Sequence, residues 1–161
     1  MVKKNITIED AKLIFRNFAG EESKFNSKGK RNFCVLLDPE TAKELEEDGW
    51  NVKWPPAREN GEERDPYLQV KVSFDNFPPK VIIVSSQGKT RLDADTINTL
   101  DYASIETADV IIRPYNYEVN GKKGVSAYLK SLYVTIQEDE LDLKYADIPD
   151  ASNPGRVFDE D

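Results

Sequence analysis

The clearest alternation of hydrophobic and polar residues lies between residues 107 and 137, in two extended segments joined by Asn120-Gly121. Val, Ile and Tyr favour strands, and Asn-Gly tolerates the positive φ of a tight turn, so we predict a β-hairpin. Strict alternation puts Leu132 on the face of Tyr128 and Tyr133 on the opposite face. One face of the hairpin then combines aromatic rings with cations: Arg113, Tyr115, Tyr117, Tyr128 and Lys130, with Lys122 and Lys123 at the tip.

Shorter hydrophobic patterns predict four further strands, at residues 11–18, 33–37, 67–74 and 81–84, and a polar turn at residues 85–91. Extended structure is also expected at residues 50–54, where Pro55 and Pro56 end it. In the strand at residues 67–74, Lys71 falls on the solvent side of the alternation.

Two short helices complete the predicted elements. Asp38 has the preferred chemistry of a helix N-cap and Pro39 that of the first helical position, and the helix is expected to end at Gly49. A second helix is expected to begin at Asp93 and run through Leu100. Short strands separated by short helices indicate an all-β fold, β-rich with two short helices. The best single candidate is an OB-fold-like, five-stranded antiparallel barrel.

A second group of cations and rings lies far from the hairpin in the sequence. Lys24, Lys28, Lys30 and Arg31 occur within the segment 23–33 without an intervening acid, and Phe25 lies among them. Such a segment is either a solvated loop or part of a ligand surface shared with the hairpin. Of the two tryptophans, Trp50 is expected in the core and Trp54 as a stacking platform.

The net charge of −8 is unevenly distributed. Residues 138–161 carry nine acids and two bases, a net charge of −7, which leaves −1 for residues 1–137. We therefore divide the chain of 161 residues into a folded domain at 1–140 and an acidic, largely disordered tail at 141–161.

Composition argues against most catalytic chemistry. The chain has no histidine, so His-based acid–base catalysis, a Ser-His-Asp triad and histidine metal ligands are excluded. The single cysteine, Cys34, lies in an apolar run and reads as a small buried hydrophobe. Asp93 and Asp95 form a carboxylate pair, but Asp93 is better explained as a helix cap than as a magnesium ligand. We predict no enzyme activity, no cofactor and no metal site.

The chain shows no apolar run long enough for a membrane span and no secretory signal, so a cytoplasmic protein is expected.

Several short motifs stand out along the chain. They are Arg31-Asn-Phe-Cys-Val-Leu-Leu-Asp-Pro-Glu, Leu45 with Gly49-Trp50-Asn51-Val52, Thr90-Arg91-Leu92-Asp93, Leu100-Asp101, and Ile112-Arg113-Pro114-Tyr115 with Gly121, Gly124, Tyr128 and Leu129. In these motifs the chain resembles the single-stranded-DNA-binding proteins encoded by bacteriophages. The resemblance implies an OB-fold with an acidic C-terminal tail, a role in phage replication or recombination, and the host cell cytoplasm as the place of action. It also implies that the tail recruits replication proteins and competes with DNA. Here Phe158 is followed by Asp159, Glu160 and Asp161 and does not end the chain, as the aromatic does in several relatives.

We therefore hypothesise sequence-independent binding of single-stranded DNA, by a monomer or a dimer. Rings stack on bases of any sequence while Lys and Arg meet the phosphates. The alternative is a virion structural or adaptor protein that uses the same β-barrel to bind protein. The predicted DNA-binding residues are Lys24, Phe25, Lys28, Lys30, Arg31, Trp54, Lys71, Arg113, Tyr115, Tyr117, Lys123, Tyr128 and Lys130.

Overall fold

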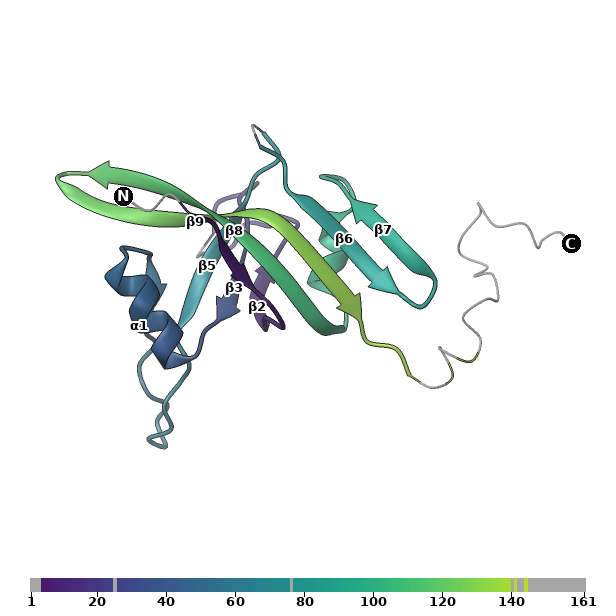
Figure 1. Cartoon of the computed structure of the whole chain (residues 1–161), viewed down its shortest axis with the longest axis horizontal. Coiled ribbons are helices and arrows are strands. Elements are labelled where there is room, and N and C mark those ends of the chain that lie inside the picture. The colour runs from purple at the N-terminus through teal and green to yellow at the C-terminus, as the bar shows by residue number, and fades with distance from the viewer. Residues whose placement is uncertain (1–3, 25, 76, 140, 142–143, 145–161) are drawn as a thin grey trace, which may run out of the picture.

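A long, twisted β-hairpin forms the backbone of the fold in a computed structural model that describes residues 4–24, 26–75, 77–139, 141 and 144. Strands β8 (Ile105–Val119) and β9 (Lys122–Ile136) pair antiparallel along almost their whole length. Asn120 and Gly121, with φ of 52° and 79°, make the two-residue turn between Val119 and Lys122. The hairpin predicted from the sequence is thus confirmed. Figure 1 shows it running across the molecule, with its tip beside α1 and its other end beside β6.

The predicted faces of β9 are wrong beyond Lys130, because a β-bulge lies there. Ile111 pairs with Ser131, whereas Ile112 pairs with Leu129, so Lys130 is an extra residue on β9. An extra residue reverses the alternation of everything after it. Leu132 is therefore fully buried on the core face, and Tyr133 is only half-buried.

The sheet has nine strands in the described part of the chain and follows the order β1-β8-β9-β5-β3-β2. Its remaining strands are β1 (Ile6–Ile8), β2 (Leu13–Asn17), β3 (Arg31–Leu36), β4 (Val52–Lys53), β5 (Tyr67–Val72), β6 (Lys80–Ser85) and β7 (Gly88–Leu92). The β-rich, OB-fold-like class is confirmed, but the sheet is mixed, because β9 runs parallel to both β5 and β6. Among the residues described, its two end strands, β1 and β2, do not pair with each other, so the sheet is open.

Two strands escaped prediction. β1, with only Ile6, Thr7 and Ile8, is too short to give a periodic signal, and β7 carries four exposed residues in succession. Residues 85–91 were expected to form a turn, but Gly88 to Arg91 pair with β6 and only the connection before them turns.

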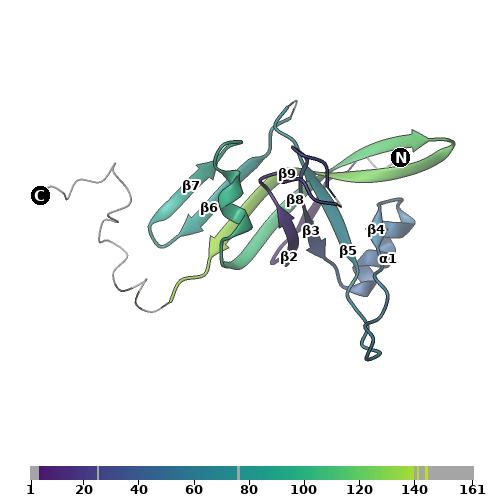
Figure 2. The same ribbon diagram turned by 180° about the vertical axis from the view of Figure 1, so that it is seen from behind.

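The helix predicted from Asp38 is α1 (Pro39–Glu47), and Asp38 caps it by accepting a hydrogen bond from the Thr41 amide at 3.1 Å. The second predicted helix is the 3₁₀-helix η1 (Ile97–Asp101). Before it, Asp93 accepts hydrogen bonds from the Asp95 and Thr96 amides. Figure 2 shows α1 beside β4, below the projecting hairpin.

One hydrophobic core lies on the inner face of the sheet. Its largest fully buried side chains include Phe18, Phe33 and Leu68 on the early strands and Leu129 and Leu132 on β9. Trp50 is 3% exposed, which confirms its prediction as a core residue. No helix in the described residues has the length and hydrophobicity that crossing a bilayer requires.

Candidate nucleic-acid interface

The outer face of the sheet carries a continuous row of polar, aromatic and cationic side chains across five strands. Asn17 pairs with Asn32, Asn32 with Lys71, Lys71 with Tyr128, and Tyr128 with Arg113. On β3, β5 and β9 the neighbouring row, Phe33, Val70 and Ala127, is buried, because successive residues of a strand face opposite sides. We call the five paired residues the central row.

Three asparagines fasten the basic loop 18–31 to this row. Asn17 and the backbone of Glu21 exchange two hydrogen bonds, at 2.9 and 3.0 Å. The Asn32 side chain donates to Asn26 Oδ1 at 2.9 Å, and the Asn26 amide in turn donates to the carbonyl of Lys30 at 2.9 Å. The lysines of the loop are therefore held at the edge of the central row by fixed backbone.

Gly20 allows the two ends of this loop to close on each other. It has φ of 73°, and its carbonyl accepts a hydrogen bond from the Gly29 amide at 2.8 Å. A Cβ atom at Gly20 would lie 3.0 Å from the Gly29 carbonyl carbon. Arg31 adds a further tie by donating to the Phe18 carbonyl at 2.8 Å.

At the hairpin end of the row, rings and cations contact one another. The Arg113 guanidinium lies 5.4 Å from the ring centroid of Tyr128 and 5.1 Å from that of Phe77. Lys71 Nζ lies 5.8 Å from the Tyr128 ring, and Tyr115 meets Tyr128 edge-on with centroids 5.8 Å apart. Tyr128 is half-buried, whereas Tyr115 and Phe77 are 53% and 69% exposed. Tyr128 thus orients two cations, and the other two rings offer free faces.

A groove of about 780 Å³ joins the two groups of residues that the sequence separates. It is lined on the loop side by Lys28, Lys30 and Arg31, and on the sheet side by Lys71 and Tyr128. We call it the central groove. The expected convergence of the basic loop and the hairpin on one side of the sheet is therefore present in the structure.

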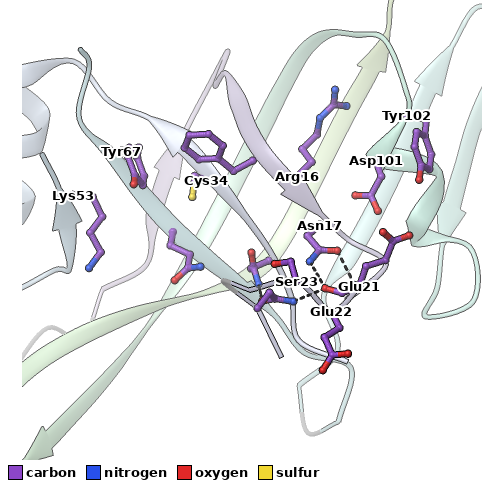
Figure 3. A pocket seen from close by; sticks show the side chains of 14 residues that line it. Arg16, Asn17, Glu21, Glu22, Ser23, Cys34, Lys53, Tyr67, Asp101 and Tyr102 are labelled. Atoms are coloured by element: carbon purple, nitrogen blue, oxygen red, sulfur yellow. Dashed lines mark hydrogen bonds between the residues drawn. The ribbon is translucent and has the colours of Figure 1, made fainter. Parts of the chain in front are cut away.

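A second hollow of about 760 Å³ continues from the central groove along the same face, and Asn26, Asn32 and Gln69 line both. In Figure 3, Lys53, Tyr67 and Cys34 lie at one side of the hollow, and Glu21 and Glu22 lie near its lower end. We call it the β5 hollow, because Tyr67 and Gln69 of β5 both line it.

Phe15 lines the β5 hollow in an unusual conformation. It is 59% exposed, has φ of 50°, and lies at a bulge where β2 holds one residue more than β3 between Ile14 and Asn17. A left-handed conformation costs a residue other than glycine about 1–2 kcal/mol. Its ring meets Tyr67 edge-on, with centroids 5.5 Å apart.

Cys34 contributes no nucleophile to this hollow. Burial raises the pKa of its thiol to about 11, against a smaller opposing influence of the Lys53 charge. The thiol is therefore neutral at physiological pH, in keeping with its prediction as a buried hydrophobe.

Several predicted residues lie away from the central groove. Tyr117 packs over Gly124, and its hydroxyl exchanges hydrogen bonds with Asn51 at 2.9 and 3.2 Å, so it anchors the hairpin to the segment after α1. Trp54 donates from its indole to Glu46 of α1 at 3.0 Å and lines neither hollow. Lys123 lies near the hairpin tip, and Lys130 is exposed at the bulge.

Lys24 is exposed on the basic loop. Phe25 and the tail residues Phe158, Asp159, Glu160 and Asp161 lie outside the described residues.

Sequence reasoning missed the exposed rings Phe15, Phe77 and Tyr102. Phe15 was hidden because it sits inside an apolar strand pattern, and only its positive φ reveals that its ring faces outward. Phe77 lies in a proline-flanked turn region, and the neighbouring Arg113 is distant in sequence. Tyr102 follows η1 and is 82% exposed.

Comparison with known proteins assigns the chain to a family. The family model of a phage ssDNA-binding domain matches residues 1–159. The chain belongs to this family. The resemblance drawn from short motifs is thereby confirmed, and with it the expectation of single-stranded-DNA binding. No curated protein sequence gives a significant match.

The fold of this family member is shared by solved structures of one phage ssDNA-binding protein. A C-terminally truncated single-stranded DNA-binding protein from bacteriophage Enc34 superposes with a TM-score of 0.55 at 12% identity, covering 84% of this chain and 87% of that one. The Enc34 protein in complex with ssDNA gives a TM-score of 0.54 at 12% identity, covering 84% and 88%. The single-stranded DNA-binding protein gp2.5 of bacteriophage T7 gives 0.44 at 14% identity, covering 94% and 98%.

Proposed function

We propose that this phage ssDNA-binding domain holds a single strand along the central groove, without catalysis and without reading its sequence. The observation that carries the proposal is the central row, which brings Lys71, Tyr128 and Arg113 into register on three neighbouring strands. A row of this kind suits a flexible strand, since an exposed sheet face with rings and cations offers a stacking surface beside charges for the phosphates. The Enc34 protein of similar fold has been captured in complex with ssDNA.

Rings and cations have different roles in this proposal. The exposed rings of Tyr115 and Phe77 stack on bases. Tyr128 instead holds Lys71 and Arg113 in place, and these two cations meet phosphates together with Lys28, Lys30 and Arg31 of the loop. Since every base has a stacking face and every nucleotide a phosphate, such contacts do not depend on sequence.

Titration of fluorescent oligo(dT) by anisotropy at several salt concentrations tests this arrangement. Tyr115→Ala should weaken binding by about 1–3 kcal/mol and leave the salt dependence unchanged, because it removes stacking alone. Lys71→Gln should instead reduce the slope of log affinity against log salt concentration by about one, because one phosphate contact is lost. If both variants bind like the natural chain, the central groove is not the site.

We further propose that the acidic tail competes with DNA for the loop and groove cations and, when displaced, recruits replication proteins in the host cytoplasm. Its support is the net charge of −7 over residues 138–161, against −1 for the rest of the chain. A tethered anion acts at high effective concentration. Deletion of residues 147–161 should therefore tighten oligo(dT) binding at low salt, with a smaller effect at high salt, where charges are screened. Unchanged or weaker binding at low salt would contradict the competition.

A further inference from the structure

We infer that the β5 hollow is a second nucleobase subsite, in which Phe15 stacks on a base of the same strand that occupies the central groove. The inference rests on the proposed function and extends it along the sheet. Of the central row, only Asn17 and Asn32 line this hollow.

Continuity of the surface is the first argument. The outward residues of β5 are Lys71, Gln69 and Tyr67. In this order, against the direction of the chain, they lead from the central groove into the β5 hollow. Residues two apart on a strand lie about 6.6 Å from each other, so the path from Lys71 to Tyr67 spans about 13 Å. A strand leaving Lys71 in this direction passes over Gln69 and reaches the ring pair of Phe15 and Tyr67.

The chemistry of the hollow suits bases more than phosphates. Phe15 and Tyr67 form an edge-to-face pair that leaves the Phe15 ring 59% exposed. Gln69 offers an amide for a base edge, while Glu21 and Glu22 at the loop repel phosphate. Lys53 lines the side of the hollow away from these acids and can meet a phosphate there. The strand is thereby directed toward Tyr67 and Lys53 and away from the loop acids.

The backbone at Phe15 is the second argument. A phenylalanine held in the left-handed region at a bulge, with most of its ring in solvent, gains little for folding from that ring. Strained and exposed positions of this kind cluster at ligand sites. Phe15→Gly removes the ring and also relieves the backbone, since glycine adopts positive φ without penalty.

The experiment compares Phe15→Gly with the natural chain on oligo(dT) of about 4 and about 16 nucleotides, the limits of OB-fold site sizes. Phe15→Gly should weaken binding of the longer strand about 5- to 100-fold and leave the shorter one unchanged, because the shorter strand fills only the central groove. Phe15→Tyr should bind like the natural chain, since it keeps a flat ring. Val119→Ala removes an equally exposed apolar side chain at the hairpin tip and should change neither affinity.

Photocrosslinking detects direct contact between DNA and the hollow, which a purely structural role of Phe15 would not produce. Oligo(dT) carrying 5-iodouracil should crosslink to the tryptic peptides 13–16 and 65–71, which contain Phe15 and Tyr67. Normal binding of the longer strand by folded Phe15→Gly, or crosslinks confined to the central groove, would overturn the subsite while leaving the proposed function intact. If the natural chain fails to bind either strand, the proposed function itself fails.

Discussion

At the scale of single residues, tight packing near the hairpin tip leaves no room for a side chain at Gly124. A Cβ atom at Gly124 would lie 2.5 Å from the Tyr117 hydroxyl and 3.1 Å from Asn51 Oδ1. Tyr117 cannot easily move aside, because its hydroxyl is bonded to Asn51. Tyr117, which the sequence analysis predicted as a DNA-binding ring, thus occupies a structural position that requires glycine at residue 124.

Gly124→Ala should therefore destabilise the domain by about 1–3 kcal/mol, the usual cost of overpacking. Urea denaturation followed by circular dichroism measures the change. Gly121→Ala is less informative, because its positive φ adds backbone strain, so Tyr117→Leu supplies the control. Combining Gly124→Ala with Tyr117→Leu should cost less than the sum of the single changes, and strict additivity would contradict the packing argument.

The Cys34 thiol predicts a pH dependence of stability. Its pKa is raised to about 11 by burial, whereas a thiol in an unfolded chain titrates near 8.5. The folded chain therefore keeps a proton that the unfolded chain releases, and this contribution to stability is lost as pH rises from about 8.5 to about 11. Cys34→Ala should show a smaller loss of stability over that window in denaturation at each pH. An identical pH profile for both chains would contradict a buried, protonated thiol.

At the scale of elements, the bulge at Lys130 decides which side chains of β9 reach the core. Leu129 and Ala127 before it, and Leu132 and Val134 after it, are all buried although they fall on opposite phases of the alternation. Sequence periodicity cannot locate such a bulge, since an exposed lysine fits either phase. The hairpin, its turn and its first strand could be predicted, but not the register beyond residue 130.

Deletion of Lys130 should leave the domain folded, because it removes the extra residue and keeps Leu132 and Val134 on the same face as Leu129 in a regular strand. Lys130→Ala keeps the extra residue and should change stability by less than about 0.5 kcal/mol. Thermal melts of both variants test these expectations. Loss of the cooperative melt in the deletion variant would mean that the fold requires the bulge itself.

Other elements show where local signals suffice and where they do not. The helix after Asp38 could be predicted because its N-cap and proline act within one turn. The strand β7 could not, because its exposed residues owe their extended form to pairing with β6. The mixed sheet likewise depends on which distant strands meet, and alternation within a strand carries no such information.

At the scale of the whole molecule, the candidate site exists only where the basic loop meets five strands. The loop and the strands β2, β3, β5, β8 and β9 each contribute to the central row or groove. Composition and patterning pointed to the loop and sheet cations and to Tyr115 and Tyr128, but not to Phe15 or Phe77. The path into the β5 hollow depends on the position of β2 against β3, which no short motif records.

The segment that follows β9 gives a prediction at this scale. Glu138 follows β9 and accepts hydrogen bonds from the Ser86 amide at 2.7 Å and its hydroxyl at 2.6 Å, and these bonds hold its pKa below the usual range. The segment just after β9 is thus held beside the β6–β7 turn at Glu138. Ser86→Ala removes the hydroxyl donor and should bring the pKa of Glu138 closer to its ordinary value, as followed by NMR titration. An unchanged titration would contradict this contact.

The parallel ladder between β5 and β9 has a consequence for synthesis. Lys71 leaves the ribosome long before Tyr128, so one edge of β5 stays unsatisfied until the C-terminal hairpin arrives. Pairings between segments so distant form late and slowly. A nascent chain therefore completes its DNA-binding face in one late step, when β9 pairs with β5. Fragments that end before the hairpin lack this face.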